Sequence, residues 1–115
     1  MPFIVHWPEG ITQPGRSSSR PVCQTDIFAT VAEVVEHPIA PGSGEDSESF
    51  LQSLIYTLEA PRTTPLIHHS VNGQFAIRSG DFKLVLPDGN RSAELYNLAK
   101  DLGEGNNIVR QNGEV

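Results

Sequence analysis

The chain has 115 residues, 37% of them hydrophobic and 19% charged, which is ordinary for one globular domain with a modest core. Its formal net charge is −6 and no Lys/Arg cluster is present, so the composition argues against a nucleic-acid partner. No apolar run is long enough to span a membrane and no leader-like segment directs export, so we expect no membrane partner. A single cysteine excludes an internal disulfide.

The first third of the chain contains one predicted strand and one predicted helix. Phe3–Trp7 is an apolar run that predicts a strand, and a Pro- and Ser-rich loop follows it. Asp26 is predicted to open a helix that Pro38 stops, with Thr25 or Asp26 capping the free amides of the first turn. The helix is indicated by apolar residues at helical spacing, namely Ile27, Val31, Val34 and Val35.

A second helix is predicted over Ser47–Glu59, after a linker at residues 37–45. Its apolar side chains fall on one face: Phe50, Leu51, Leu54, Ile55 and Leu58. Several acidic residues of the helices and the linker are expected to meet water rather than to form a metal or acid–base site: Glu33, Glu36, Glu45, Asp46, Glu48 and Glu59.

The segment from Leu66 to Leu98 predicts a small sheet. Leu66–Val71 is a strand candidate whose adjacent histidines, His68 and His69, would point to opposite faces. A β-hairpin follows, because two apolar runs flank Gly80, which can take the positive φ of a tight turn. Glu94–Leu98 is a further strand candidate, and a polar stretch over residues 100–107 follows it.

The hairpin pattern also predicts a core. Five apolar side chains can alternate onto one face of the sheet: Phe75, Ile77, Phe82, Leu84 and Leu86. We expect this face to be buried, with Phe82 and Leu84 as its anchors, and Arg78 could pair with Glu94 across strands.

Two motifs in this region resemble the sulfatases. Ala76–Leu84 reads AIRSGDFKL, and Leu95–Asn107 reads LYNLAKDLGEGNN, in the order and separation found near the C-terminus of that family. Pro2–Pro8, Pro21–Thr30 and Asp46–Leu54 also align with family segments. The resemblance covers nearly the whole chain but only the last part of a sulfatase.

The resemblance implies an α+β fold: an antiparallel sheet of about four strands with one or two helices, from a parent fold that is alkaline-phosphatase-like. Residues 1–60 would be the tail of the large domain with connecting helices, and residues 61–115 the C-terminal subdomain. The chain ends where the terminal helix of that subdomain is expected to begin. One sheet face would then be covered by the helix after Asp26 or after Ser47, or by a second copy of the chain.

The chemistry of the family lies upstream of these segments. Complete sulfatases use a formylglycine, made from Cys or Ser in a C/S-x-P/A-x-R motif, and a divalent metal, calcium or magnesium. Cys23 lacks both the Pro/Ala and the Arg of that motif, so we interpret it as a structural thiol and assign no cofactor or metal to this chain. In the family, residues before the hairpin approach the active-site cleft, which makes His68 and His69 candidate substrate contacts.

Three functions are compatible with the sequence. The chain can be a sulfatase segment that contributes the small subdomain and one wall of the substrate cleft, with the large domain as its partner and a sulfated substrate only in the full-length context. It can be a stand-alone interaction module of sulfatase ancestry that uses the faces left exposed by the missing domain, or a remnant without function of its own. The isolated chain is expected to self-associate or to be a partly disordered monomer. Localisation stays open, although sulfatases are often exported.

Overall fold

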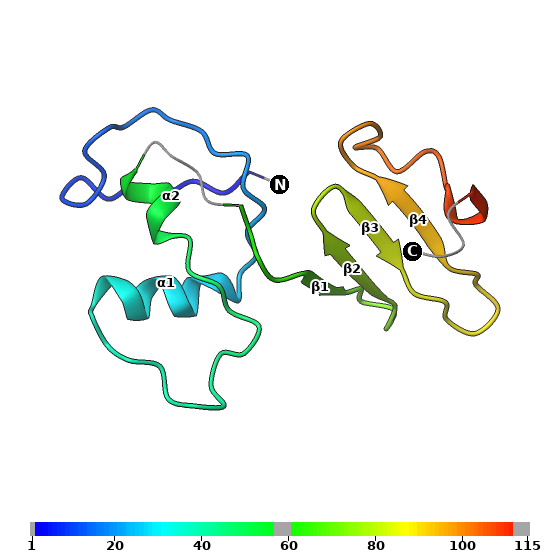
Figure 1. Ribbon diagram of the computed structural model, residues 1–115, viewed down its shortest axis with the longest axis horizontal. Coiled ribbons are helices and arrows are strands. Elements are labelled where there is room, and N and C mark those ends of the chain that lie inside the picture. The colour runs from blue at the N-terminus through cyan, green and yellow to red at the C-terminus, as the bar shows by residue number, and fades with distance from the viewer. Residues whose placement is uncertain (1, 57–60, 112–115) are drawn as a thin grey trace. The chain divides into compact units, whose positions relative to one another are not determined.

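The computed structural model describes residues 2–56 and 61–111. The chain divides into two compact units, Met1–Thr63 and Thr64–Val115. The first contains the helices α1 (Asp26–Val34) and α2 (Leu51–Ile55), and the second contains a four-stranded antiparallel sheet and the short 3-10 helix η1 (Val109–Gln111) (Figure 1). The α+β fold expected from the sequence is therefore confirmed. The assignment of residues 1–60 to the tail of a large domain stays a prediction.

Helix α1 begins where the sequence predicted but ends earlier than Pro38. Its last turn closes through two backbone bonds, from Glu36 N–H to the Glu33 carbonyl (3.2 Å) and from His37 N–H to the Ala32 carbonyl (2.9 Å). Glu36 adopts a left-handed φ of 53°. This combination is a Schellman motif, which satisfies the orphan carbonyls of a helix end without a glycine. The local backbone, rather than the proline, therefore terminates the helix.

The predicted cap of α1 is wrong. Thr25 occupies the N-cap position but makes no side-chain bond to the first turn. Ser47, from a distant segment, instead accepts a hydrogen bond from Ala29 N–H (2.9 Å) and donates one to the Thr25 carbonyl (2.7 Å). A hydroxyl from elsewhere in the unit thus satisfies an amide at the helix start.

Helix α2 is much shorter than the predicted helix over Ser47–Glu59. The backbone N–H groups before α2 form hydrogen bonds to side chains of α1: Glu48 N–H donates to Asp26 (3.0 Å) and Phe50 N–H donates to Thr30 Oγ1 (3.1 Å). Residues 57–60 of the predicted helix lie outside the described residues. No helix within residues 2–56 and 61–111 is long and apolar enough to cross a membrane.

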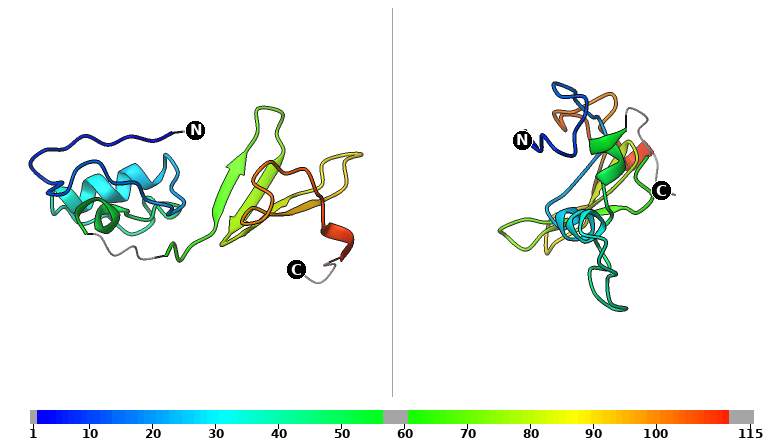
Figure 2. Two further views of the ribbon diagram at one scale, coloured as in Figure 1. Left: turned by 90° about the horizontal axis from the view of Figure 1, so that it is seen from above. Right: turned by 90° about the vertical axis from the view of Figure 1, so that its left-hand side faces the viewer.

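The strand predicted at Phe3–Trp7 does not form. Residues 2–7 have no regular structure, and the Trp7 carbonyl accepts the turn bonds of Gly10 and Ile11 N–H. A strand needs a neighbour that accepts its backbone hydrogen bonds, and none lies beside this segment in the described part of the first unit. Most of this unit is irregular backbone that runs around α1 (Figure 2).

The sheet has the strand order β1-β2-β3-β4, with β1 at Leu66–His69, β2 at Phe75–Ser79, β3 at Phe82–Val85 and β4 at Glu94–Asn97. The predicted hairpin is confirmed, with Ser79 paired to Phe82 and Gly80 at φ 54° between them. Beyond β4 the chain folds back along its outer edge, where Ile108 N–H binds the Leu95 carbonyl (2.9 Å).

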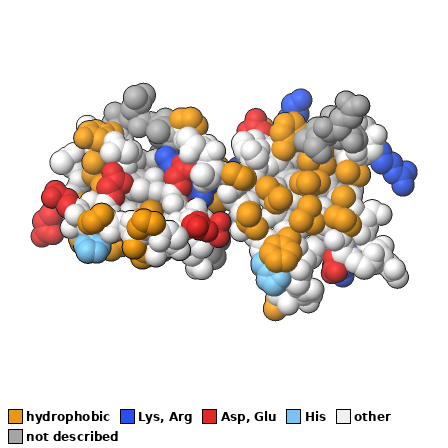
Figure 3. Space-filling view, turned by 60° about the horizontal axis from the view of Figure 1, so that its bottom comes forward, with side chains coloured by type: hydrophobic (Ala, Val, Ile, Leu, Met, Phe, Trp, Pro, Cys, Tyr) orange, Lys and Arg blue, Asp and Glu red, His pale blue; other side chains and the backbone are white. Residues whose placement is uncertain are grey.

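The two faces of the sheet differ in composition. The register places the predicted set Phe75, Ile77, Phe82, Leu84 and Leu86 on one face, together with Ile67 and Leu95. We call this the apolar face; it is prominent in the space-filling view (Figure 3). The opposite face, which we call the polar face, carries His68, Arg78, Lys83 and Glu94 around a small buried cluster of Ala76, Val85 and Tyr96.

The prediction that the apolar face is the buried core holds only in part. Ile77, Leu84 and Leu86 are half-buried. Phe75 is 48% exposed and Phe82 is 40% exposed, whereas Leu95 of the same face is only 2% exposed. The chain that returns along β4 is bonded to the backbone of Leu95, whereas Phe75 and Phe82 remain in contact with solvent. The alternation of apolar residues in the sequence identified which side chains share a face, but not which of them are buried.

Candidate functional site

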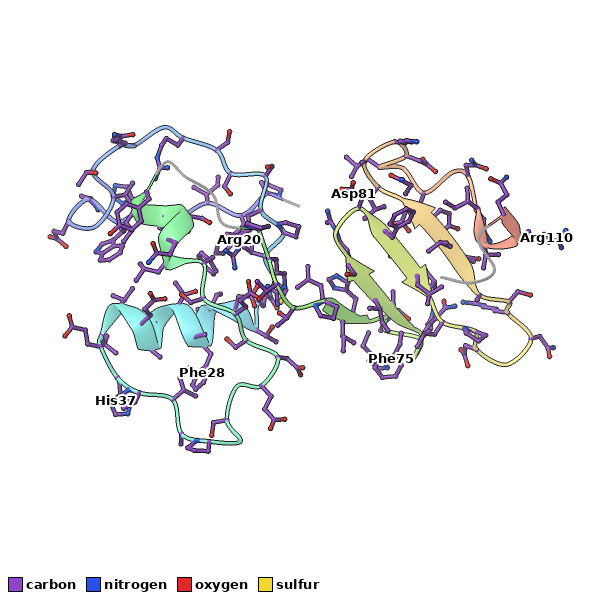
Figure 4. All side chains as sticks on the ribbon, in the orientation of Figure 1. Arg20, Phe28, His37, Phe75, Asp81 and Arg110 are labelled. Atoms are coloured by element: carbon purple, nitrogen blue, oxygen red, sulfur yellow. The ribbon has the colours of Figure 1, made fainter. Side chains whose placement is uncertain are left out.

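The two candidate histidines lie on opposite faces of the sheet, as strand geometry predicts. In β1, His68 pairs with Ala76 and His69 pairs with Phe75 of β2. The His69 ring packs against the Phe75 ring on the apolar face, with centroids 4.5 Å apart, and Phe75 is labelled in Figure 4. His68 is exposed and belongs to the polar face. The two imidazoles therefore cannot act on one ligand from the same face.

Two polar contacts organise the polar face. Lys83 donates to both carboxylate oxygens of Glu104, at 2.6 and 2.7 Å. The Tyr96 hydroxyl donates to Glu94 at 2.9 Å. This hydrogen bond, followed by burial and by the nearby carboxylates, raises the pKa of Tyr96. The protonated hydroxyl is thus favoured here, and its hydrogen bond holds the Glu94 side chain in place.

A shallow open hollow of about 520 Å³ lies over the polar face. Its lining includes the buried Ala76 and Val85 and the charged groups Arg78, Lys83, Glu94 and Glu104. His68 also borders it, as do His69 and Phe75 at the turn between β1 and β2. The hollow falls within the range of roughly 300–1,000 Å³ that is typical of small-ligand sites.

Arg78 does not form the predicted cross-strand pair with Glu94. The register places Arg78 directly opposite Lys83, and β3 separates it from the strand that carries Glu94. The Arg78 Nε atom lies 3.5 Å from the Gly80 carbonyl, at the outer limit of a hydrogen bond. Glu94 is instead held by Tyr96, its neighbour on the same strand.

A network of buried charges in the first unit was not foreseen from the sequence. Asp26 is fully buried, and its carboxylate accepts hydrogen bonds from Arg62 (2.6 Å), Cys23 N–H (2.8 Å) and Glu48 N–H (3.0 Å). The Arg62 side chain is only 6% exposed. Because Asp26 and Arg62 are 36 positions apart, no local sequence pattern predicts their contact.

Glu48 forms the second half of this network, so the expectation that it meets water is wrong. It pairs with Arg20, labelled in Figure 4, at 2.5 Å and accepts further bonds from the amide and the hydroxyl of Thr63. The Arg20 side chain is 5% exposed and that of Glu48 is 18% exposed. Together the two ion pairs connect the segments around residues 20–26, 48 and 62–63. Each buried charge has a partner of opposite sign, so we interpret the network as structural: it holds these segments together.

Folding stability of the first unit should fall at acidic pH because of Asp26. Burial, the largest single influence, acts to raise the pKa of Asp26, but the bonds from Arg62, Glu48 and Cys23 and the charge of Arg62 together lower it below its ordinary value. A lowered folded-state pKa contributes stability above the unfolded-state pKa of about 4, and this stability is lost as the pH falls through the folded-state pKa. Urea unfolding between pH 7 and pH 2 should show the loss, and Asp26→Asn should flatten it. An unchanged pH profile in Asp26→Asn would contradict this assignment.

The residues present do not fit a formylglycine or a metal site. The Cys23 thiol is partly buried and lies 2.8 Å from the Thr25 hydroxyl, and the residues after it are Gln24 and Thr25. Within residues 2–56 and 61–111, no three His, Cys, Asp or Glu side chains gather as metal ligands would.

Comparison with known proteins identifies relatives but no family model. No protein-family model matches the chain. The chain is 30% identical, over 129 aligned residues that include all of it, to an N-acetylgalactosamine-6-O-sulfatase of Bacteroides thetaiotaomicron. It spans only 25% of that relative. A solved structure described under the metabolism of multiple glycosaminoglycans by the same organism (BT33336S-sulf) matches 77% of this chain and 21% of its own length, with 26% identity and a TM-score of 0.68.

Over its whole length the chain is therefore similar to about a quarter of a sulfatase, which is consistent with a C-terminal portion of that family. The resemblance expected from the two motifs is thereby confirmed. Because the chain spans about a quarter of its curated relative, the activity of the whole relative does not transfer to it directly.

Proposed function

We propose that these residues form the C-terminal subdomain of a sulfatase and one wall of its substrate cleft, while residues outside them perform the hydrolysis of the sulfate ester. The observation that carries this proposal is the match of the entire chain to a quarter of an N-acetylgalactosamine-6-O-sulfatase. Neither a formylglycine motif nor a metal-ligand set is found in the residues described. The subdomain would thus position substrate without touching the reacting bond.

Exposed apolar surface supports a large domain as the partner. In α1, the buried positions are Asp26, Ala29 and Thr30, whereas the apolar stripe predicted from the sequence is exposed: Ile27, Val31, Val34 and Val35. The first unit exposes Phe3, Phe28 and Tyr56 as well. A helix that directs its apolar stripe outward is typical of a surface that another domain covers. Each Å² of apolar surface covered there would contribute roughly 25 cal/mol.

The substrate we propose is a sulfated glycan that contains an amino sugar. Support comes from the two relatives, one named as an N-acetylgalactosamine-6-O-sulfatase and the other described under glycosaminoglycan metabolism. Such glycans carry sulfate and carboxylate groups on neighbouring sugars, so a cleft wall has to offer cations and hydrogen-bond donors. His68 and His69 remain candidates for contact with the substrate, and only one can face it from the regular strand.

The chain by itself is expected not to hydrolyse sulfate esters. The physical reason is that the described residues offer neither an activated nucleophile nor a Lewis acid. The measurement is turnover of an activated aryl sulfate at high protein concentration with calcium or magnesium added, beside a complete sulfatase as positive control. Turnover that survives repurification and disappears in Cys23→Ala would overturn the expectation.

A stand-alone interaction module is the second candidate, and the exposed side chains of the apolar face favour it. Ile67 is 58% exposed and shares this face with the exposed Phe75 and Phe82, so this surface could serve a partner other than a sulfatase domain. The genomic sequence directly upstream of Met1 separates the candidates. An in-frame C/S-x-P/A-x-R motif supports the sulfatase segment, and its absence supports the module.

A further inference from the structure

We infer that the hollow on the polar face is an anion subsite in which Arg78 and His68 bind a sulfate or carboxylate group of a glycan. The inference rests on the proposed function for its substrate class. Beyond that function, the inference names Arg78 and His68 as the residues that contact the substrate, and it excludes His69 from such contact. The group bound would belong to a sugar beside the one that reacts.

The register brings the two side chains to the same place. Arg78 pairs with Leu66, and His68 pairs with Ala76, so Arg78 and His68 are diagonal neighbours on the same face of β1 and β2. Diagonal neighbours in an antiparallel pair are roughly 7–8 Å apart, close enough for two long side chains to contact one anion. Both residues border the hollow, whose buried lining includes Ala76 between them and the adjacent Val85.

The charges around the hollow leave Arg78 available for a ligand. Of the two carboxylates that border the hollow, Glu104 is bound by Lys83 and Glu94 by the Tyr96 hydroxyl. In the described residues, Arg78 forms no ion pair, and the bond it makes is the long one from Nε to the Gly80 carbonyl. Both terminal nitrogens of its guanidinium can therefore form the paired hydrogen bonds with which arginine recognises sulfate and carboxylate. Lys83, directly opposite, is held by the Glu104 carboxylate, so Arg78 is the cation that the hollow offers to a ligand.

His69 lacks these features. It borders the hollow, but its ring packs on Phe75 and the strand directs it to the apolar face, away from Arg78 and Lys83. The neighbouring residues on that face are hydrocarbon, which offers an anion no hydrogen-bond donor. Between the two adjacent histidines, the geometry assigns ligand contact to His68.

The test is a binding titration of the 115-residue chain, followed by backbone amide NMR, with three tetrasaccharide probes. One carries both sulfate and uronate groups, one is its desulfated counterpart, and one is sulfated but lacks uronate. Arg78→Gln is expected to weaken binding of the preferred probe about tenfold or more, as loss of charge-assisted hydrogen bonds implies. His68→Gln should weaken binding less than Arg78→Gln does. Arg78→Lys should give an intermediate loss, because lysine keeps the positive charge but lacks the paired N–H groups of the guanidinium. Weak binding of the desulfated probe identifies the anion as sulfate, and weak binding of the probe without uronate identifies it as carboxylate.

The matched control is Arg91→Gln, an exposed arginine outside the lining of the hollow. It should bind as the unaltered chain does. Equal loss in Arg91→Gln, full affinity in Arg78→Gln, or no binding by the unaltered chain would each overturn the subsite. None of these results would affect the sulfatase assignment, which depends on the upstream motif and on hydrolysis by the full-length protein. If Arg78→Gln loses its folded amide spectrum, Arg78→Lys and His68→Gln decide the outcome.

Discussion

Arg62→Met is expected to lower the free energy of unfolding of the first unit by about 3–5 kcal/mol, because it leaves the Asp26 carboxylate buried without its cation. The carboxylate is fully buried and would retain only two backbone amides as donors. A loss of this size is a large fraction of the 5–15 kcal/mol that stabilises a typical domain. Urea unfolding, followed by amide NMR signals of residues 2–56, measures the change.

Glu33→Met is the matched control for this experiment. It replaces an exposed charge on α1 in the same unit and should change stability by no more than about 0.5 kcal/mol. The pair can also be removed as a whole in Asp26→Leu/Arg62→Met. This double variant should recover part of the loss but not all of it, since the amides of Cys23 and Glu48 then lose their acceptor. A loss below about 1 kcal/mol in Arg62→Met would mean that water screens the pair in solution.

Leu95→Ala is expected to destabilise the sheet unit by about 2–5 kcal/mol. Leu95 is 2% exposed, and both its N–H and its carbonyl are bonded to the returning segment, by Asn107 Oδ1 and by Ile108 N–H. Truncation would leave a cavity that this fixed surrounding cannot easily close. Unfolding followed by amide signals of β2–β4 measures the loss.

Phe82→Ala provides the comparison, because the sequence alone assigned Phe82 as a core anchor. With 40% of the residue exposed, truncation should cost about 1–2 kcal/mol, clearly less than Leu95→Ala. The order of the two losses is the decisive result. If Phe82→Ala costs more than Leu95→Ala, something covers the apolar face in solution, and self-association would be the first explanation to examine by light scattering.

The candidate site was only partly predictable. The separation of His68 and His69 onto opposite faces follows from the two-residue period of a strand and needs no tertiary information. The position of Arg78 beside His68 depends on how β1 pairs with β2, which the sequence did not specify. The salt bridge from Lys83 to Glu104, 21 positions away, decides that Arg78 rather than Lys83 is available to a ligand. Such a pairing can be read only from the folded chain.

The sequence by itself determined the features that depend on neighbouring residues: the start of α1, the hairpin around Gly80, the shared apolar face of β2 and β3, and the two sulfatase motifs. Their causes are short-range, namely backbone torsion preferences and side-chain alternation. Only the tertiary structure decided that Asp26 is buried against Arg62, that Ser47 serves the start of α1, and that Leu95 rather than Phe82 is covered. These outcomes depend on which distant segments meet, because burial and ion pairing are properties of the contact rather than of either segment alone.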